Sequence, residues 1–205
     1  QTNKINVYLY LKEKGLRHEA IVGIMANIDH ETGVKVFNEK SGKYEYKGTF
    51  SHKQQEVGNS KLGKGLFQLT TKLHKEGYQQ FLKENNLKDS NEANIDYFLD
   101  TILNPKSKMR EQIGGKNLDD LREVFKKGNI QEVTEAINNK WLKPGTYGNR
   151  EENPEAHLKN LEDRNFRAKK LSKEVNTFNE QFSSVDTKDF RYLPTNVNKI
   201  LETFS

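Results

Sequence analysis

The stretch Ile28-Asp29-His30-Glu31-Thr32-Gly33 decides the fold, because it joins a helical pattern to a change in chain character. In residues 19–28, which precede it, apolar side chains recur at the 3.6-residue spacing of an amphipathic helix. They are Ile21, Ile24, Met25 and Ile28. Glu31 continues this stripe, three residues after Ile28. The stretch therefore predicts a buried helix with a glutamate at its end.

The position of Glu31 points to acid chemistry. A carboxyl group held against apolar neighbours has its charged form disfavoured, so its pKa rises and it can donate a proton near neutral pH. The bland interpretation is a structural glutamate at a helix end that pairs with a lysine. Sequence features elsewhere in the chain decide between the two.

The pattern around this stretch predicts an α+β, predominantly helical fold. Helices are expected before it, at residues 5–14 and 17–29. After it, residues 35–50 alternate in side-chain type around Ser41-Gly42, which indicates a β-hairpin. Amphipathic spacing predicts further helices at residues 67–84, 92–103, 118–127, 130–142 and 155–182. We expect one domain over residues 1–182, and a tether with a short terminal helix over residues 183–205.

Composition narrows the class of protein. Hydrophobic residues make up 33% and charged residues 31% of the 205-residue chain, which is polar but rich enough in apolar residues for a core. No run approaches the ~18–20 apolar residues that a membrane helix needs. The net charge of +5 favours an anionic partner, whether a nucleic acid, a membrane surface or a cell-wall polymer, or else serves solubility.

Several chemistries are not expected. The chain has no cysteine, and its five histidines show no ligand spacing. His30-Glu31 opens like a zinc-protease motif, but Val34 stands where the second histidine is required. Residues 58–65 nearly match a phosphate-binding loop, but Gly65 replaces the magnesium-binding hydroxyl. We therefore expect no metal and no cofactor. Without a helix of clustered Arg and Asn, we expect no nucleic-acid partner.

Five segments occur in an order that is similar to that of a known family. They are Asn27-Ile28-Asp29-His30-Glu31-Thr32-Gly33, Gly63-Lys64-Gly65-Leu66-Phe67-Gln68-Leu69-Thr70, Ile95-Asp96-Tyr97-Phe98-Leu99, Trp141-Leu142-Lys143-Pro144-Gly145 and residues 164–171. Together they resemble the lysozyme-like phage tail lysozyme family, over about residues 4–175. Three positions depart from its motifs. Thr32 replaces a serine, Leu69 an aromatic residue and Lys143 an arginine.

The resemblance implies a lysozyme-like fold with a small hairpin lobe across a groove. It implies cleavage of the β-1,4 bond between N-acetylmuramic acid and N-acetylglucosamine in peptidoglycan, with Glu31 as general acid. The motif glutamine Gln68 would line the cleft, with Phe67 and Thr70 beside it. Tyr147 is a candidate for stacking on sugars, and so are Tyr44 and Tyr46. Trp141 is another, although an aromatic residue at its spacing is more often part of the core.

A second carboxylate is needed if the enzyme uses the two-carboxylate scheme, about 5–9.5 Å from the first. Glu45 is the first candidate, because strand alternation puts it opposite the face of Tyr44 and Tyr46. Glu56 is the second. If neither serves, a single-glutamate enzyme remains, including a lytic transglycosylase. The alternative from another class is an inactive wall-binding module of the same fold.

The same resemblance gives the expected setting. We expect a lysin carried on a phage virion or tail, or released, that acts extracellularly on the bacterial cell wall. Its partners would be peptidoglycan glycan strands and the anionic wall. A further module fused beyond residue 205 would be its route to other tail or virion proteins.

Overall fold

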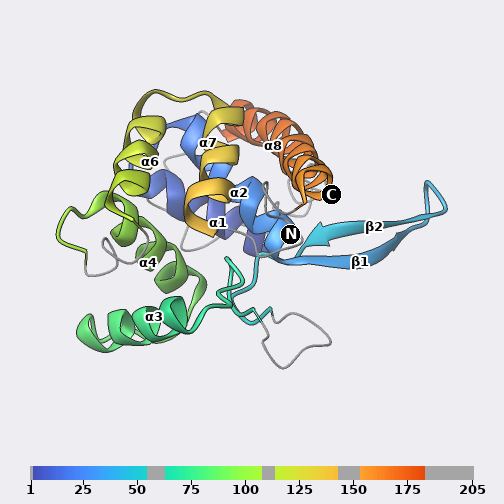
Figure 1. The fold of residues 1–205 in the computed structure, drawn as a ribbon. Helices are drawn as coiled ribbons and strands as arrows, with labels where there is room; N and C mark the ends of the chain where they lie inside the picture. The colour runs from blue at the N-terminus through green and yellow to red at the C-terminus, as the bar shows by residue number, and fades with distance from the viewer. Residues whose placement is uncertain (1, 55–62, 108–113, 143–152, 183–205) are drawn as a thin grey trace.

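A computed structural model describes residues 2–54, 63–107, 114–142 and 153–182 of the chain (Figure 1). In chain order the elements are α1 (Thr2–Glu13), α2 (His18–Glu31), β1 (Gly33–Asn38), β2 (Lys43–Gly48), α3 (Lys72–Glu84), α4 (Asn91–Leu103), α6 (Gly115–Lys127), α7 (Ile130–Ala136), the π-helix η1 (Ile137–Leu142) and α8 (Pro154–Phe182). The expected predominantly helical α+β class is confirmed. The expected tether lies outside the described residues.

Helix α2 is the centre of the helical body. Every residue from 20 to 28 is buried, which extends the predicted apolar stripe to the whole circumference of the helix. Helices α7 and α8 pack against it on adjacent sides. Helix α7 approaches closely at Gly23, where an added Cβ would lie 2.6 Å from Val133 Cγ1. Only glycine allows this contact, so the sequence of α2 sets how near α7 can come.

An aromatic cluster forms the core on the side of α4. The rings of Phe67 and Phe98 stack at 4.4 Å, and the Trp141 ring meets Phe98 edge-on at 4.8 Å. Trp141 Nε1 donates a hydrogen bond to Thr101 Oγ1 at 2.8 Å, which satisfies its buried donor. Trp141 is thus a core residue. The helix predicted over residues 130–142 divides into α7 and η1, whose wider turn carries Trp141 into this cluster.

The two strands form an antiparallel hairpin that projects from the helical body (Figure 1). Its register pairs Gly33 with Gly48 at the base and Asn38 with Lys43 near the turn. The hairpin begins and ends two residues earlier than predicted, at Gly33 and Gly48. The Gly48 amide donates to Asp29 Oδ1 at 2.9 Å, which fastens the base of the hairpin to the last turn of α2. The hairpin direction is therefore fixed by the same helix end that carries Glu31.

The helix predicted over residues 67–84 begins later, at Lys72. Gly65 and Gln68 have φ angles of 85° and 46°, in the left-handed region that a right-handed helix cannot contain. The segment before Lys72 is therefore a compact turn, and Thr71 Oγ1 caps the helix by accepting from the His74 amide at 3.3 Å. The apolar spacing of Phe67 and Leu69 was misleading, because both side chains are buried from a loop.

Candidate active site

Three consecutive ionisable residues end α2, and helix geometry turns each in a different direction. They are Asp29, His30 and Glu31, about 100° apart around the axis. Helix α8 runs past this end of α2 and meets all three side chains with residues of its own. Its contributions are Asn160, Asp163, Arg164 and Arg167. The end of α2 is thus held in a polar network between two helices.

Glu31 is bound to a buried arginine. Arg164 is 1% exposed, and its Nη2 donates to Glu31 Oε1 at 2.5 Å. The other guanidinium nitrogens are also satisfied, with Nη1 donating to Asn27 Oδ1 at 2.7 Å and Nε to Asn160 Oδ1 at 2.8 Å. The Glu31 side chain is 19% exposed. Arg164 therefore fixes the Glu31 carboxylate in orientation while leaving it accessible to a ligand.

This ion pair corrects the expectation of an apolar surrounding for Glu31. The helix stripe leading to Glu31 is apolar, but the neighbours of the carboxylate itself are Arg164 and, through it, Asn27 and Asn160. A long arginine side chain from α8 fills the space that periodicity within α2 assigned to apolar contacts. A chain segment more than a hundred residues away decides the environment, which is why periodicity within α2 did not predict it.

A second network lies beside the first. His30 Nδ1 is 2.7 Å from Asp163 Oδ2, the atom that also accepts from Arg167 Nε at 2.7 Å. Arg167 Nη1 donates in turn to Asp29 Oδ2 at 2.7 Å. Burial alone raises the pKa of the Asp163 carboxyl, but the hydrogen bonds from His30 and Arg167 outweigh it and lower the pKa to about 2. Asp163 is therefore ionised throughout the neutral range.

The depressed pKa of Asp163 predicts a loss of stability in acid. The folded-state pKa lies below the ordinary value of 3.8, so the stabilisation is present above that value and is lost as pH falls from about 4 toward 2. We expect Asp163→Asn to flatten the pH dependence of the free energy of unfolding in this window. Urea melts of both proteins between pH 5 and pH 2 measure it. Parallel curves would contradict the network.

Thr32 connects α2 to the segment after the hairpin. Its Oγ1 donates to the Ile28 carbonyl at 2.7 Å and accepts from the Phe50 amide at 3.1 Å. Its carbonyl accepts from the Thr49 amide at 3.1 Å. Threonine thus supplies a hydroxyl that closes the helix and anchors the chain that leaves the hairpin. Thr32 therefore holds the chain that leaves β2 close to the start of β1, one residue from Glu31.

The loop of residues 63–71 is held by its own glutamine. Gln68 Nε2 donates to the carbonyls of Gly65, at 2.7 Å, and Gln54, at 3.1 Å. Thr49 Oγ1 donates to Gln54 Oε1 at 3.2 Å, so hydrogen bonds link this loop to the segment that Thr32 anchors. The left-handed backbone at Gln68 is a strained conformation, which such contacts maintain. The loop and the end of α2 are thus parts of one connected framework.

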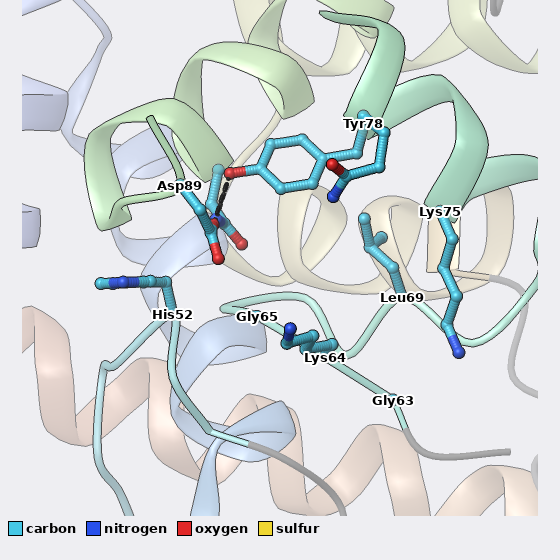
Figure 2. Close-up of a pocket in the computed structure, with 10 residues that line it drawn as sticks. His52, Gly63, Lys64, Gly65, Leu69, Lys75, Tyr78 and Asp89 are labelled. Carbon is cyan, nitrogen blue, oxygen red and sulfur yellow. Dashed lines mark hydrogen bonds between the residues drawn. The ribbon is translucent and has the colours of Figure 1, made fainter. Parts of the chain in front are cut away.

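A cavity of about 190 Å³ lies between this loop, α3 and the start of α4 (Figure 2). Leu69 and the Tyr78 ring form its apolar wall, and the Lys64 and Lys75 side chains also line it. Tyr78 donates to Asp89 Oδ1 at 2.7 Å, and burial and this carboxylate raise the pKa of the phenol. Leu69 stands where the resemblance gives an aromatic residue. Leucine offers a ligand a smaller contact area than a ring does, but the wall is still apolar.

A model of the phage tail lysozyme family matches residues 2–175, most of the chain. The chain belongs to the phage tail lysozyme family. No curated protein and no solved structure matches it. The resemblance found in the sequence is thereby confirmed, and the lysozyme-like fold fits the helices and the hairpin.

Membership of the phage tail lysozyme family indicates the broad activity. It indicates a peptidoglycan-degrading enzyme of the glycoside hydrolase type, which comes from a bacteriophage and acts on the bacterial cell wall. Among the described residues, no helix is long and apolar enough to cross a membrane. No group of three or more His, Asp or Glu side chains in those same residues could hold a metal ion.

The structure separates the predicted substrate-binding residues. Gln68 is partly buried and its amide holds the loop, while Thr70 is exposed just before α3. Phe67 is buried against Phe98 and Trp141. It therefore anchors the loop in the core and offers no surface to a sugar. Tyr147 and Glu56 lie outside the described residues.

Glu45 lies in the middle of β2, opposite Val36. Its Oε1 accepts a hydrogen bond from Asn38 Nδ2 at 2.6 Å, on the hairpin face opposite Tyr44 and Tyr46. The predicted alternation of these side chains is therefore observed. Its role as a second carboxylate stays a prediction.

The partners of the Glu31 network were not singled out from the sequence. Arg164 and Arg167 were noticed only as part of a motif, and Asn160 and Asp163 were not noticed at all. A signal was present, since Asn160 and Arg164, and Asp163 and Arg167, are spaced four residues apart on one helix. Polar pairs on a predicted core helix, opposite a cluster of ionisable residues elsewhere, indicate a buried network.

Proposed function

We propose that this phage tail lysozyme cleaves the β-1,4 bond between N-acetylmuramic acid and N-acetylglucosamine, with Glu31 as general acid. One observation carries the proposal. Arg164 holds Glu31 Oε1, while Oε2 has no hydrogen-bond partner among the described residues. A carboxyl group with one anchored and one open oxygen is oriented for proton transfer to a ligand atom.

The proposed chemistry follows from this arrangement. A proton on Oε2 passes to the glycosidic oxygen, the bond from that oxygen to the muramic acid C1 breaks, and positive charge develops on the sugar ring. The Glu31 carboxylate left behind is stabilised by Arg164. In a hydrolase, water then adds to C1 and gives up its proton to Glu45. In a lytic transglycosylase, the sugar's own 6-hydroxyl adds to C1 and its proton returns to the Glu31 carboxylate. The muramic acid product has a reducing end after hydrolysis and a non-reducing 1,6-anhydro end after transglycosylation.

Glu45 is our candidate for the group that activates the water. The hairpin face with Gly48 turns toward Asp29, since a Cβ on Gly48 would lie 2.6 Å from Asp29 Cα. Glu45 lies on the opposite face of the hairpin from Gly48, and β1 of this hairpin begins two residues after Glu31. Glu45 is three residues, or roughly 10 Å, along β2 from Gly48.

We therefore expect Glu45→Gln to lower the rate of wall lysis by about 10²-fold, because the general base is lost. Glu56→Gln is the matched control and should retain activity within a few-fold. Turbidity clearance of purified walls, with thermal melting as the folding control, measures both. If both variants keep most of the activity, the second carboxylate is wrong and the single-glutamate route is favoured.

The proposed bond is tested by the groups that digestion releases. New reducing ends, without new free amines, are expected when the purified protein digests walls. Solubilised wall with neither group would identify a transglycosylase, because a 1,6-anhydro end does not reduce. Free amines would indicate a peptide or amide bond and overturn the proposal. Walls that stay intact after incubation with the protein would favour the alternative, an inactive wall-binding module of the same fold.

A further inference from the structure

A groove of about 400 Å³ separates the hairpin from α8. Tyr44 and Tyr46 of β2 line one side, and Phe166 of α8 lines the other. Asp29 contributes to the lining, while Glu31, on another side of α2, does not. The groove is thus outside the Glu31–Arg164 pair. Figure 1 shows the hairpin and α8 that form its two walls.

The exposed aromatic side chains of the described residues gather at this groove. Tyr44 is 64%, Tyr46 62% and Phe166 68% exposed, and Phe37, beside Tyr44, is 54% exposed. The other large hydrophobic side chains that are exposed are leucines on other surfaces. Rings this exposed contribute little to the core. A cluster of them on one surface is typical of a binding site.

The hairpin holds its rings in place before any ligand arrives. Phe37 meets Tyr44 edge to face with 5.2 Å between ring centroids. Lys35 Nζ lies 4.6 Å from the centroid of the Tyr44 ring, a cation–π contact. A ring fixed by its neighbours loses little conformational freedom on binding. These contacts therefore favour a ligand that packs on ring faces.

The charges of the groove indicate the kind of ligand. Its lining contains as many acidic as basic residues, and most are paired, as Arg167 is with Asp29 and Asp163. A polyanion such as a teichoic acid would gain little from a neutral lining. A protein partner would bury these charges in the centre of an interface, where charged residues are depleted. A neutral, hydroxyl-rich chain suits both the rings and the paired charges.

We propose that the hairpin–α8 groove binds a stretch of peptidoglycan glycan strand beyond the sugars that are cleaved at Glu31. The C–H faces of sugar rings carry slight positive charge and pack on the negative faces of aromatic rings. The hydroxyl and N-acetyl groups at the sugar edges reach the polar side chains. Glu45 borders the groove as well, so a strand lying there continues toward the candidate second carboxylate. This inference rests on the proposed function for its choice of glycan.

The test measures binding apart from cleavage. Glu31→Gln protein is sedimented with insoluble walls that have been stripped of teichoic acid, and the Kd is read from the unbound fraction. We expect Tyr44→Ala, Tyr46→Ala and Phe166→Ala each to raise the Kd about 3- to 10-fold, the size of an aromatic contact. Tyr44→Phe and Tyr46→Phe keep the ring and should bind as the parent does.

Leu158→Ala is the matched control, since Leu158 is 58% exposed on the same helix but does not line the groove. Its Kd should not change. Alanine variants that bind walls as tightly as the parent would overturn the inference and leave a protein partner as the occupant. Equal losses from Leu158→Ala would overturn it too. Ring-dependent binding, together with no product release from walls by the wild-type protein, would instead overturn the proposed function and leave the groove inference standing.

Discussion

Glu31→Gln is expected to abolish wall lysis, with a loss of at least ~10²–10⁴-fold in rate, because the general acid is removed. Glutamine is nearly the same shape and still offers Arg164 an oxygen at the Oε1 position. The fold should therefore persist, with some loss of stability because the buried guanidinium loses its anionic partner. Turbidity clearance measures the rate of lysis, and thermal melting of the same preparation measures the stability.

Two further variants make this result specific. Glu31→Asp keeps the charge beside Arg164 but withdraws the carboxyl by one methylene, so it should fold well and also lose most activity. Glu123→Gln, on the exposed surface of α6, should be as active as the wild type. Unchanged clearance by folded Glu31→Gln protein would remove Glu31 from the mechanism.

Arg164→Met is expected to cause a large loss of stability. The change leaves Glu31, Asn27 and Asn160 without the donor that they share, and Asn27 and the guanidinium site are buried. Breaking a buried ion pair from one side costs about 3–5 kcal/mol. For a chain of this length that lowers the melting temperature by roughly 6–20 °C. Urea and thermal melts measure it.

Lys169→Ala on the same helix is the control for Arg164→Met. Its side chain is exposed, so the free energy of unfolding should change by less than about 0.5 kcal/mol. Arg164→Lys should fall between the two, because an ammonium cannot reach all three acceptors at once. An Arg164→Met protein as stable as the wild type would show that the network between α2 and α8 does not support the helix end.

Elements with strong local signals were predictable from the sequence. Apolar spacing predicted α2 and α4 to within about a residue or two at each end, and the Ser41-Gly42 turn predicted the hairpin. Where tertiary contacts override the local pattern, prediction was wrong. Gly65 and Gln68 adopt left-handed backbone that delays α3, and η1 widens to bury Trp141. Neither feature changes the 3.6-residue spacing of the apolar residues from which these helices were predicted.

The candidate site shows the same division between local and distant information. Glu31 could be singled out because its own helix carries the stripe that leads to it. Arg164 could not, since it reaches Glu31 from 133 residues away. A periodic pattern reports which side of a helix is buried, and says nothing of which distant side chain fills the space beside it. The environment of a catalytic residue is therefore the last property to follow from sequence alone.

The central claim is that Glu31 directs cleavage of the glycan strand. Mass analysis of the products that wild-type and Glu31→Gln protein release from the same purified walls tests it most directly. We predict disaccharide-peptide products that end in reducing N-acetylmuramic acid from the wild type, and none from Glu31→Gln. The same products from both proteins, or products cut only within the peptides, would contradict the claim.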